Sequence, residues 1–254
     1  MTSVAEIAPD LYRLCTEVRD AVARVLDPAS IRGRRRLEWH YLPLVTSAAV
    51  TTAALAVLVD SPVLVYRLSV ATAIVGLALF GLSLGIGPIG LLVRGRPLPI
   101  STDLRRDVGI LAGILSLLHV AIGLMVYPDV RSYFVYPMAE WQRRLFLLRL
   151  DDFGAANWTG LAASVILVLL LATSGDWALR RYGARRWKQI QQLAYWAFGI
   201  VFVHGVVYQR LDPHPQHALV VIFGIIVAGV VGLQAAGYLA YVARADAPSG
   251  RTPR

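Results

Sequence analysis

The chain has 254 residues, of which 57% are hydrophobic and only 16% charged, and its mean hydropathy is +0.58. This composition excludes an ordinary soluble domain and is typical of a membrane protein. The formal net charge of +9 indicates an anionic partner, either nucleic acid or a membrane surface, and the placement of the charges decides between them. The single cysteine, Cys15, excludes an intramolecular disulfide and any metal cluster built on several cysteines.

The first 40 residues differ from the rest of the chain. Between Leu11 and Val25, apolar residues recur at spacings of three and four, which predicts an amphipathic helix that ends near Pro28. The basic run IRGRRR follows at 31–36. We expect residues 1–40 to form a cytosolic amphipathic helix and a basic collar that binds lipid phosphates. Docking of a cytosolic partner is the alternative.

Six apolar runs follow, each close to the roughly 20 residues that a membrane-spanning helix needs. The fifth run is the least hydrophobic because Gln191, Gln192 and His204 interrupt it, which is typical of a helix inside a bundle. We therefore predict an all-α fold, a polytopic membrane helical bundle formed by residues 41–242, with a short cytosolic tail at 243–254. The predicted spans are 41–59, 68–92, 108–127, 158–174, 190–208 and 217–241.

The lysines and arginines are distributed unequally between the two sides of the predicted bundle. The N-terminal segment, the loops after the second and fourth spans and the tail together carry 19 of the 25, and the opposite loops carry six. The positive-inside rule then places both termini in the cytoplasm. This bias explains most of the basic excess without nucleic acid and predicts a multi-pass protein of the cell (inner or plasma) membrane.

Two histidines lie inside predicted spans that cross the membrane in the same direction. At 1.5 Å per residue, His119 is about 12 Å and His204 about 8 Å from the outer end of its span, so the two can meet in the outer half of the bilayer. A lone buried histidine is most often a hydrogen-bonded packing residue. Two at matching depth also suit a haem iron with an imidazole on each face, and the spacing alone leaves both interpretations open. His40, His214 and His217 are predicted at the membrane surfaces.

Three stretches of the sequence together resemble the ferric reductase-like transmembrane superfamily. They are LGIGPIGLLV at 84–93, LRRDVGILAGILSLLHV at 104–120, and the segment 158–204, which runs from WTGLAAS through a basic GARRWK loop to a helix ending in histidine. Within the superfamily, the pattern is most similar to the haem-binding membrane subunits of bacterial methionine sulfoxide reductase systems. The resemblance extends over roughly residues 65–210.

The resemblance implies a bundle that holds b-type haem and passes electrons across the membrane. His119 and His204 match the outer haem-ligand positions, so the resemblance makes them the axial ligands of the iron. Two-haem relatives carry inner histidines at the positions of Gln191 and of Arg105 or Arg106 in this chain. We therefore predict one haem b, in the outer half of the bilayer, and no inner haem.

The resemblance also allows an FMN at the inner side, where arginines of 94–106 and 180–188 would bind its phosphate. The positive-inside bias explains the same arginines more simply. Arg67, Arg131 and Arg210 are candidates for pairing with haem propionates. We expect the short tail to hold no NAD(P)H domain. A separate cytosolic flavin reductase or a membrane quinol is then the expected donor, and a partner reductase or ferric iron outside the cytoplasm the acceptor.

These observations predict an electron-transfer subunit of an oxidoreductase system that contains haem. The alternative is a haem-free membrane protein of the same fold, which acts as a small transporter or handles protons through its intramembrane histidines. The lost inner histidines keep this alternative open.

Overall fold

The computed structural model describes residues 36–94, 101–136, 140, 147–211 and 216–245. In this part of the chain the regular elements are helices, and six of the helical segments are long and apolar enough to cross a membrane. The predicted all-α polytopic bundle is therefore confirmed. The predicted amphipathic helix, most of the basic collar and the tail beyond residue 245 lie outside the described residues.

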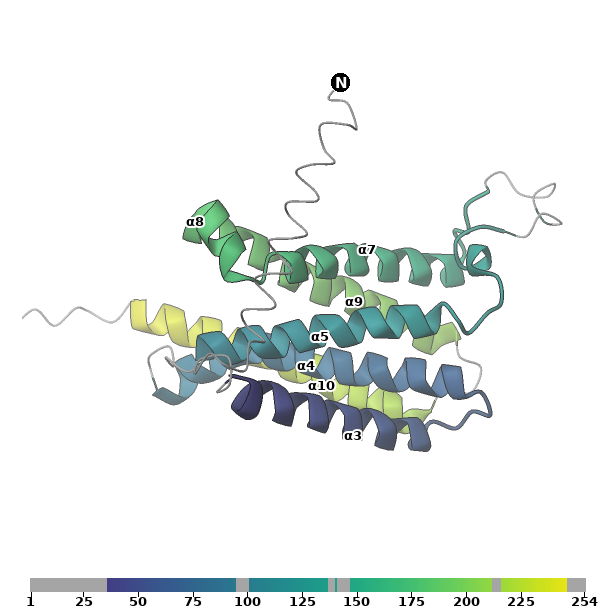
Figure 1. Ribbon diagram of the computed structural model, residues 1–254, viewed down its shortest axis with the longest axis horizontal. Helices are drawn as coiled ribbons and strands as arrows, with labels where there is room; N and C mark the ends of the chain where they lie inside the picture. Colours follow the sequence, from purple (N-terminus) through teal and green to yellow (C-terminus); the bar gives the residue numbers. More distant parts are fainter. Residues whose placement is uncertain (1–35, 95–100, 137–139, 141–146, 212–215, 246–254) are drawn as a thin grey trace, which may run out of the picture.

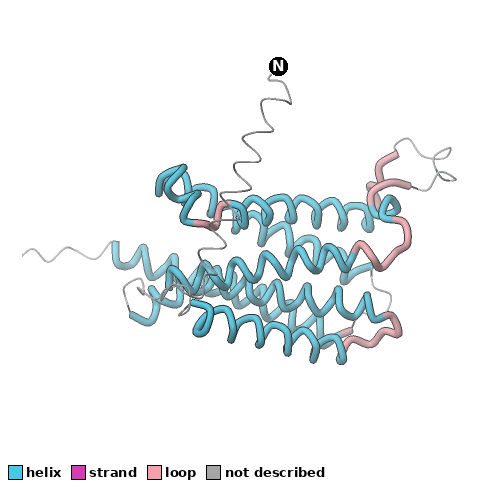
Figure 2. Tube along the Cα trace, in the orientation of Figure 1, coloured by secondary structure: helices cyan, strands magenta, loops and turns pink. Residues whose placement is uncertain are grey.

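The long helices lie side by side along the long axis of the molecule (Figure 1), and short described segments connect α3 to α4 and α7 to α8 (Figure 2). α4 packs along α5 and also contacts α3 and α10, whereas α7 packs along α9. The α4–α5 and α7–α9 pairs meet mainly where α5 contacts α7. In chain order the elements are η1 (Leu37–Tyr41, a π-helix), α3 (Leu42–Leu58), α4 (Leu64–Arg94), α5 (Ser101–Gly123), η2 (Val130–Tyr133, a 3₁₀-helix), α7 (Asp152–Ala172), α8 (Asp176–Gln191), α9 (Leu193–Leu211) and α10 (His217–Ala245).

A proline inside α4 explains how α10 is fitted to it. Pro88 has no N–H, so the carbonyl of Leu84, four residues earlier, loses its helical donor. Gln234 of α10 donates to this carbonyl at 2.8 Å. One turn further along α10, Gly237 leaves room for the proline ring, because a Cβ there would lie 2.8 Å from the Cβ of Pro88. In a bilayer, where water cannot satisfy the free carbonyl, this pairing stabilises the α4–α10 contact.

One segment differs from the sequence prediction. The basic stretch expected as a loop between the fourth and fifth spans is helical, as α8, and α9 begins only at Leu193. The helix is interrupted at Gly183, whose φ of 74° and ψ of 159° are non-helical. Alanine, arginine, lysine and glutamine are good helix formers, so charge alone does not turn this stretch into a loop. A positive φ is readily adopted only by glycine.

Candidate functional site

α4 and α5 together orient the imidazole of His119. Its Nδ1 lies 2.9 Å from the carbonyl oxygen of Ser69 and 3.3 Å from the hydroxyl of the same residue. A carbonyl can only accept, so Nδ1 of the neutral ring carries the hydrogen and Nε2 keeps its lone pair. A backbone group of the neighbouring helix therefore fixes both the tautomer and the direction of this side chain.

α7 holds the imidazole of His204 in the same way. Its Nδ1 lies 2.8 Å from the carbonyl oxygen of Ala156, so its Nε2 also keeps the lone pair. One turn along α7, Gly160 lies directly against the ring. A Cβ on this residue would lie 2.8 Å from Cε1 and 2.9 Å from Nδ1 of His204. The glycine is required for this close approach of α7 to the ring.

The structure brings the two imidazoles together between the helix pairs. The ring centroids of His119 and His204 are 6.3 Å apart, with the planes at 76°. No residue of the described part of the chain donates a hydrogen bond to either Nε2, and protein atoms do not completely cover either residue. The pair is therefore a site with two unused imidazole nitrogens inside a membrane-spanning bundle.

Both histidines lie toward the same end of the bundle, but the depth predicted for His119 needs correction. α5 ends at Gly123, four residues after His119, rather than at 127. At 1.5 Å per residue, His119 is about 6 Å from the end of its helix and His204, seven residues before the end of α9, about 10 Å. The order of the two depths is the reverse of the prediction, although the two rings still meet.

Aromatic rings lead from His204 to the end of the bundle. The ring of Tyr208 lies 4.9 Å from that of His204, and its hydroxyl donates to Oδ1 of Asn157 at 2.6 Å. Phe153 lies 6.2 Å from Tyr208, and the guanidinium of Arg149 lies 4.5 Å above the Phe153 ring. Sequence reasoning missed these residues, although the spacing of Tyr208 four positions after His204 places both on one helix face.

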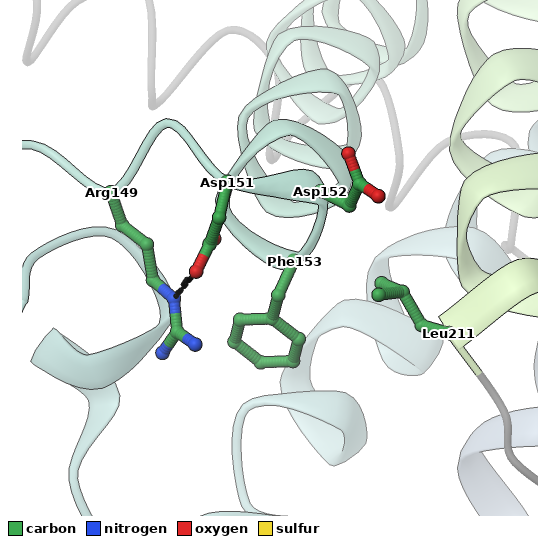
Figure 3. A pocket seen from close by; sticks show the side chains of 5 residues that line it. All are labelled: Arg149, Asp151, Asp152, Phe153 and Leu211. Carbon is green, nitrogen blue, oxygen red and sulfur yellow. Dashed lines mark hydrogen bonds and ion pairs between the residues drawn. The ribbon is translucent and has the colours of Figure 1, made fainter.

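A shallow depression of about 440 Å³ opens beside these rings (Figure 3). Arg149 reaches across its edge and pairs with Asp151 at 3.1 Å. Of the cations predicted to face the haem, Arg67 donates instead to the carbonyl of Ala56 in α3 at 2.6 Å. The residues that line the depression are Arg149, Asp151, Asp152, Phe153 and Leu211.

A second buried polar cluster lies at the opposite end of α5. Asp107 has no exposed side-chain surface, and its carboxylate pairs with Arg36. The same carboxylate lies 2.7 Å from Nδ1 of His40 and accepts from the hydroxyl of Tyr41 at 3.0 Å. The sequence gives no local signal of this cluster, because its partners are 66 to 71 positions apart.

Two polar side chains predicted to replace inner haem-ligating histidines connect helices in this structure. Gln191 of α8 donates to the carbonyl and hydroxyl oxygens of Thr173, at the end of α7. Arg106 of α5 pairs with Asp176 of α8 at 2.5 Å. Both side chains therefore hold α8 against the rest of the bundle.

The architecture defines a polytopic membrane protein with an adjacent pair of intramembrane histidines. The chain matches the family model of the ferric reductase like transmembrane component over residues 69–203, more than half its length, and it belongs to this family. The match begins at Ser69, whose carbonyl holds His119, and stops one residue before His204. No curated protein and no solved structure matches the chain. The family and the six apolar helices make this a multi-pass membrane protein of an electron-transfer family.

Proposed function

We propose that the chain is a haem-containing membrane subunit that transfers electrons, with one b-type haem held between His119 and His204. The observation that carries the proposal is the imidazole pair, with ring centroids 6.3 Å apart and each Nδ1 hydrogen-bonded to a backbone carbonyl. Histidine ligands of metals characteristically donate their other ring nitrogen in this manner, which fixes the ring and raises the basicity of the ligating nitrogen.

The spacing of the two rings fits one metal ion between them. An imidazole nitrogen lies about 2 Å from a bound transition metal, and the ring centre about 1 Å further, so two rings on opposite sides have centroids roughly 6 Å apart. The observed 6.3 Å agrees with this value. The apolar faces of the surrounding helices suit an apolar macrocycle, and neither histidine has another use for its Nε2 among the described residues.

A haem bound there would supply a one-electron redox centre whose potential depends on its axial ligands and their hydrogen bonds. The chain's own contribution is to hold both rings rigidly. The carbonyls of Ser69 and Ala156 orient them, and Gly160 allows α7 to approach His204 closely.

The inner end of the bundle supports a single haem. The resemblance matches inner histidines of two-haem relatives to Gln191 and to Arg105 or Arg106, and Gln191 and Arg106 are both engaged in contacts that hold α8. Neither an amide nor a guanidinium replaces an imidazole as a haem-iron ligand. Electrons from a cytosolic flavin reductase, an FMN bound at the inner side, or a membrane quinol would enter at this end, which the positive-inside rule assigns to the cytoplasm.

Electrons would leave at the opposite end, where the ring of Tyr208 and the depression beside Phe153 connect the histidine pair to the surface. A partner reductase or ferric iron outside the cytoplasm is the proposed acceptor. The membrane of residence is then the cell's inner or plasma membrane.

Absorption spectroscopy tests the proposal. The purified full chain, oxidised and then reduced with dithionite, should show a b-type spectrum, and a pyridine haemochrome assay should give one haem per chain. His119→Ala and His204→Ala should each abolish the Soret band in a protein that still elutes as a folded species. The matched control His217→Ala should keep it. Two haems would contradict the single site.

A colourless, folded wild-type protein would overturn the haem proposal. The haem-free alternative, a small transporter or proton-handling protein, would then account for the two intramembrane histidines.

A further inference from the structure

α8 carries a concentration of positive charge that the histidine pair does not use. All five of its cations after Ala178 are exposed, and within the described part of the chain no carboxylate lies within ion-pair distance of them. They are referred to below as the α8 cations: Arg180, Arg181, Arg185, Arg186 and Lys188.

The position of α8 places these charges at the membrane interface. α7 has 21 residues, which corresponds to about 31 Å and spans the roughly 30 Å hydrocarbon core. α8 begins four residues after α7 ends, and it lies at the end of the bundle beyond α7 (Figure 1). Its cations therefore lie at the depth of the lipid headgroups.

The apolar residues of α8 fit the same environment. Leu179 and Tyr182 are each 39% exposed, and the rings of Trp177 and Tyr182 pack edge to face at 6.1 Å. Exposed aromatic and aliphatic side chains that alternate with arginines are typical of segments lying in the bilayer interface. A surface for a soluble acidic protein would not need these apolar groups.

α8 is also anchored to the bundle at both of its ends. Trp187 donates from Nε1 to the carbonyl of Thr173 at 2.9 Å, and Gln191 binds the hydroxyl of the same threonine at 3.2 Å. At the start of the helix, Asp176 pairs with Arg106 of α5. These contacts keep the α8 cations at this end of the bundle.

We infer that α8 forms a binding surface for anionic phospholipid headgroups. The α8 cations attract the headgroups of acidic lipids beside the bundle. Lipid bound there stabilises the end of the bundle from which α9, the helix of His204, starts. The inference requires the membrane location and does not depend on haem.

Native mass spectrometry of the full chain tests the inference. The protein is taken from nanodiscs of phosphatidylcholine with phosphatidylglycerol as the minor component, and the retained lipids are counted. Phosphatidylglycerol should be retained in preference to phosphatidylcholine. Arg185→Gln/Arg186→Gln should lower its retention roughly tenfold, because each cation near an anionic surface contributes separately to the attraction.

The matched control removes two other exposed cations at the same end of the bundle. Arg105→Gln/Arg244→Gln has the same net charge and should lower phosphatidylglycerol retention much less than the α8 variant does, because neither cation belongs to α8.

Three results would overturn the inference. One is equal loss of lipid in the two double variants, which would show an effect of net charge alone. Another is unchanged retention in the α8 variant. The third is unchanged lipid retention with lost binding of an acidic flavoprotein, which would make α8 a protein-docking surface. Haem content, measured on the same samples, separates this inference from the proposed function. A colourless protein that retains phosphatidylglycerol would overturn the haem proposal and leave the lipid inference standing.

Discussion

The two ends of the bundle both carry buried polar side chains, but they use their hydrogen-bonding capacity differently. At one end, the carboxylate of Asp107 is engaged by Arg36 and by two further side chains. At the other end, His119 and His204 each use one ring nitrogen and leave the second without a partner among the described residues. Burying polar groups in an apolar medium is costly unless they are paired. A completely paired cluster therefore indicates a structural role, and a half-paired one indicates a ligand.

The largest expected effect tests the structural role of the Asp107 cluster. Asp107→Ala should lower the free energy of unfolding by about 3–5 kcal/mol, because a buried guanidinium loses the carboxylate with which it is paired. Denaturant unfolding in detergent, followed by circular dichroism, measures the change. Asp176→Ala, which breaks a more exposed pair with Arg106, is the control and should cost no more than about 1 kcal/mol. Equal costs in the two variants would remove the distinction between the two ends.

Crowding the histidine pair should disturb the ligand rather than the fold. In Gly160→Ala the new methyl group meets the ring of His204, and overpacking of this kind costs about 1–3 kcal/mol. We expect haem retention to weaken roughly tenfold or more. Dialysis against a haem-binding competitor, followed at the Soret band, measures the loss. Gly199→Ala, where a Cβ meets nothing within 4 Å, should retain haem like the wild type. Normal haem retention in Gly160→Ala would show that His204 does not need its present position.

The third prediction concerns a backbone carbonyl, which also needs a hydrogen-bond partner when it lies in an apolar medium. Gln234→Leu leaves the carbonyl of Leu84 without a donor and should cost about 1–2 kcal/mol of unfolding free energy. Adding Pro88→Ala restores a helical N–H to that carbonyl, so the double variant should recover part of the loss. Unfolding of the wild type, both single variants and the double variant forms the measurement. Strictly additive effects would show that the glutamine does not act through the proline.

The smallest effect is expected at Tyr208, whose hydroxyl is already paired with Asn157. Tyr208→Phe keeps the ring beside His204 and should cost about 1 kcal/mol or less, with an unchanged Soret band. Spectra and redox titration of the haem in the two proteins measure this. A large change in the spectrum or the reduction potential would show that the tyrosine hydroxyl acts on the ligand site. A completely paired side chain would then also have a functional role.

The sequence predicted the six spans and the meeting of the two histidines, because long apolar runs and intramembrane imidazoles are strong signals. It did not predict what holds the imidazoles. Ser69 and Ala156 act through backbone carbonyls, which every residue possesses, and Gly160 acts through the absence of a side chain. The sequence did not predict α8 for a different reason. The helix is strongly charged, and an apolar run was the signal used to predict helices.

The contact between α4 and α10 has a consequence for biogenesis. Leu84 and Gln234 are 150 positions apart, and at about 5–20 residues per second the ribosome takes roughly 8–30 s to make the chain between them. During this interval α4 is already synthesised, but the carbonyl freed by Pro88 has no glutamine to bind. α10, the last helix of the described chain, therefore supplies a hydrogen bond that α4 has lacked since its synthesis. The surface of α4 around the Leu84 carbonyl must stay accessible during assembly until α10 packs against it.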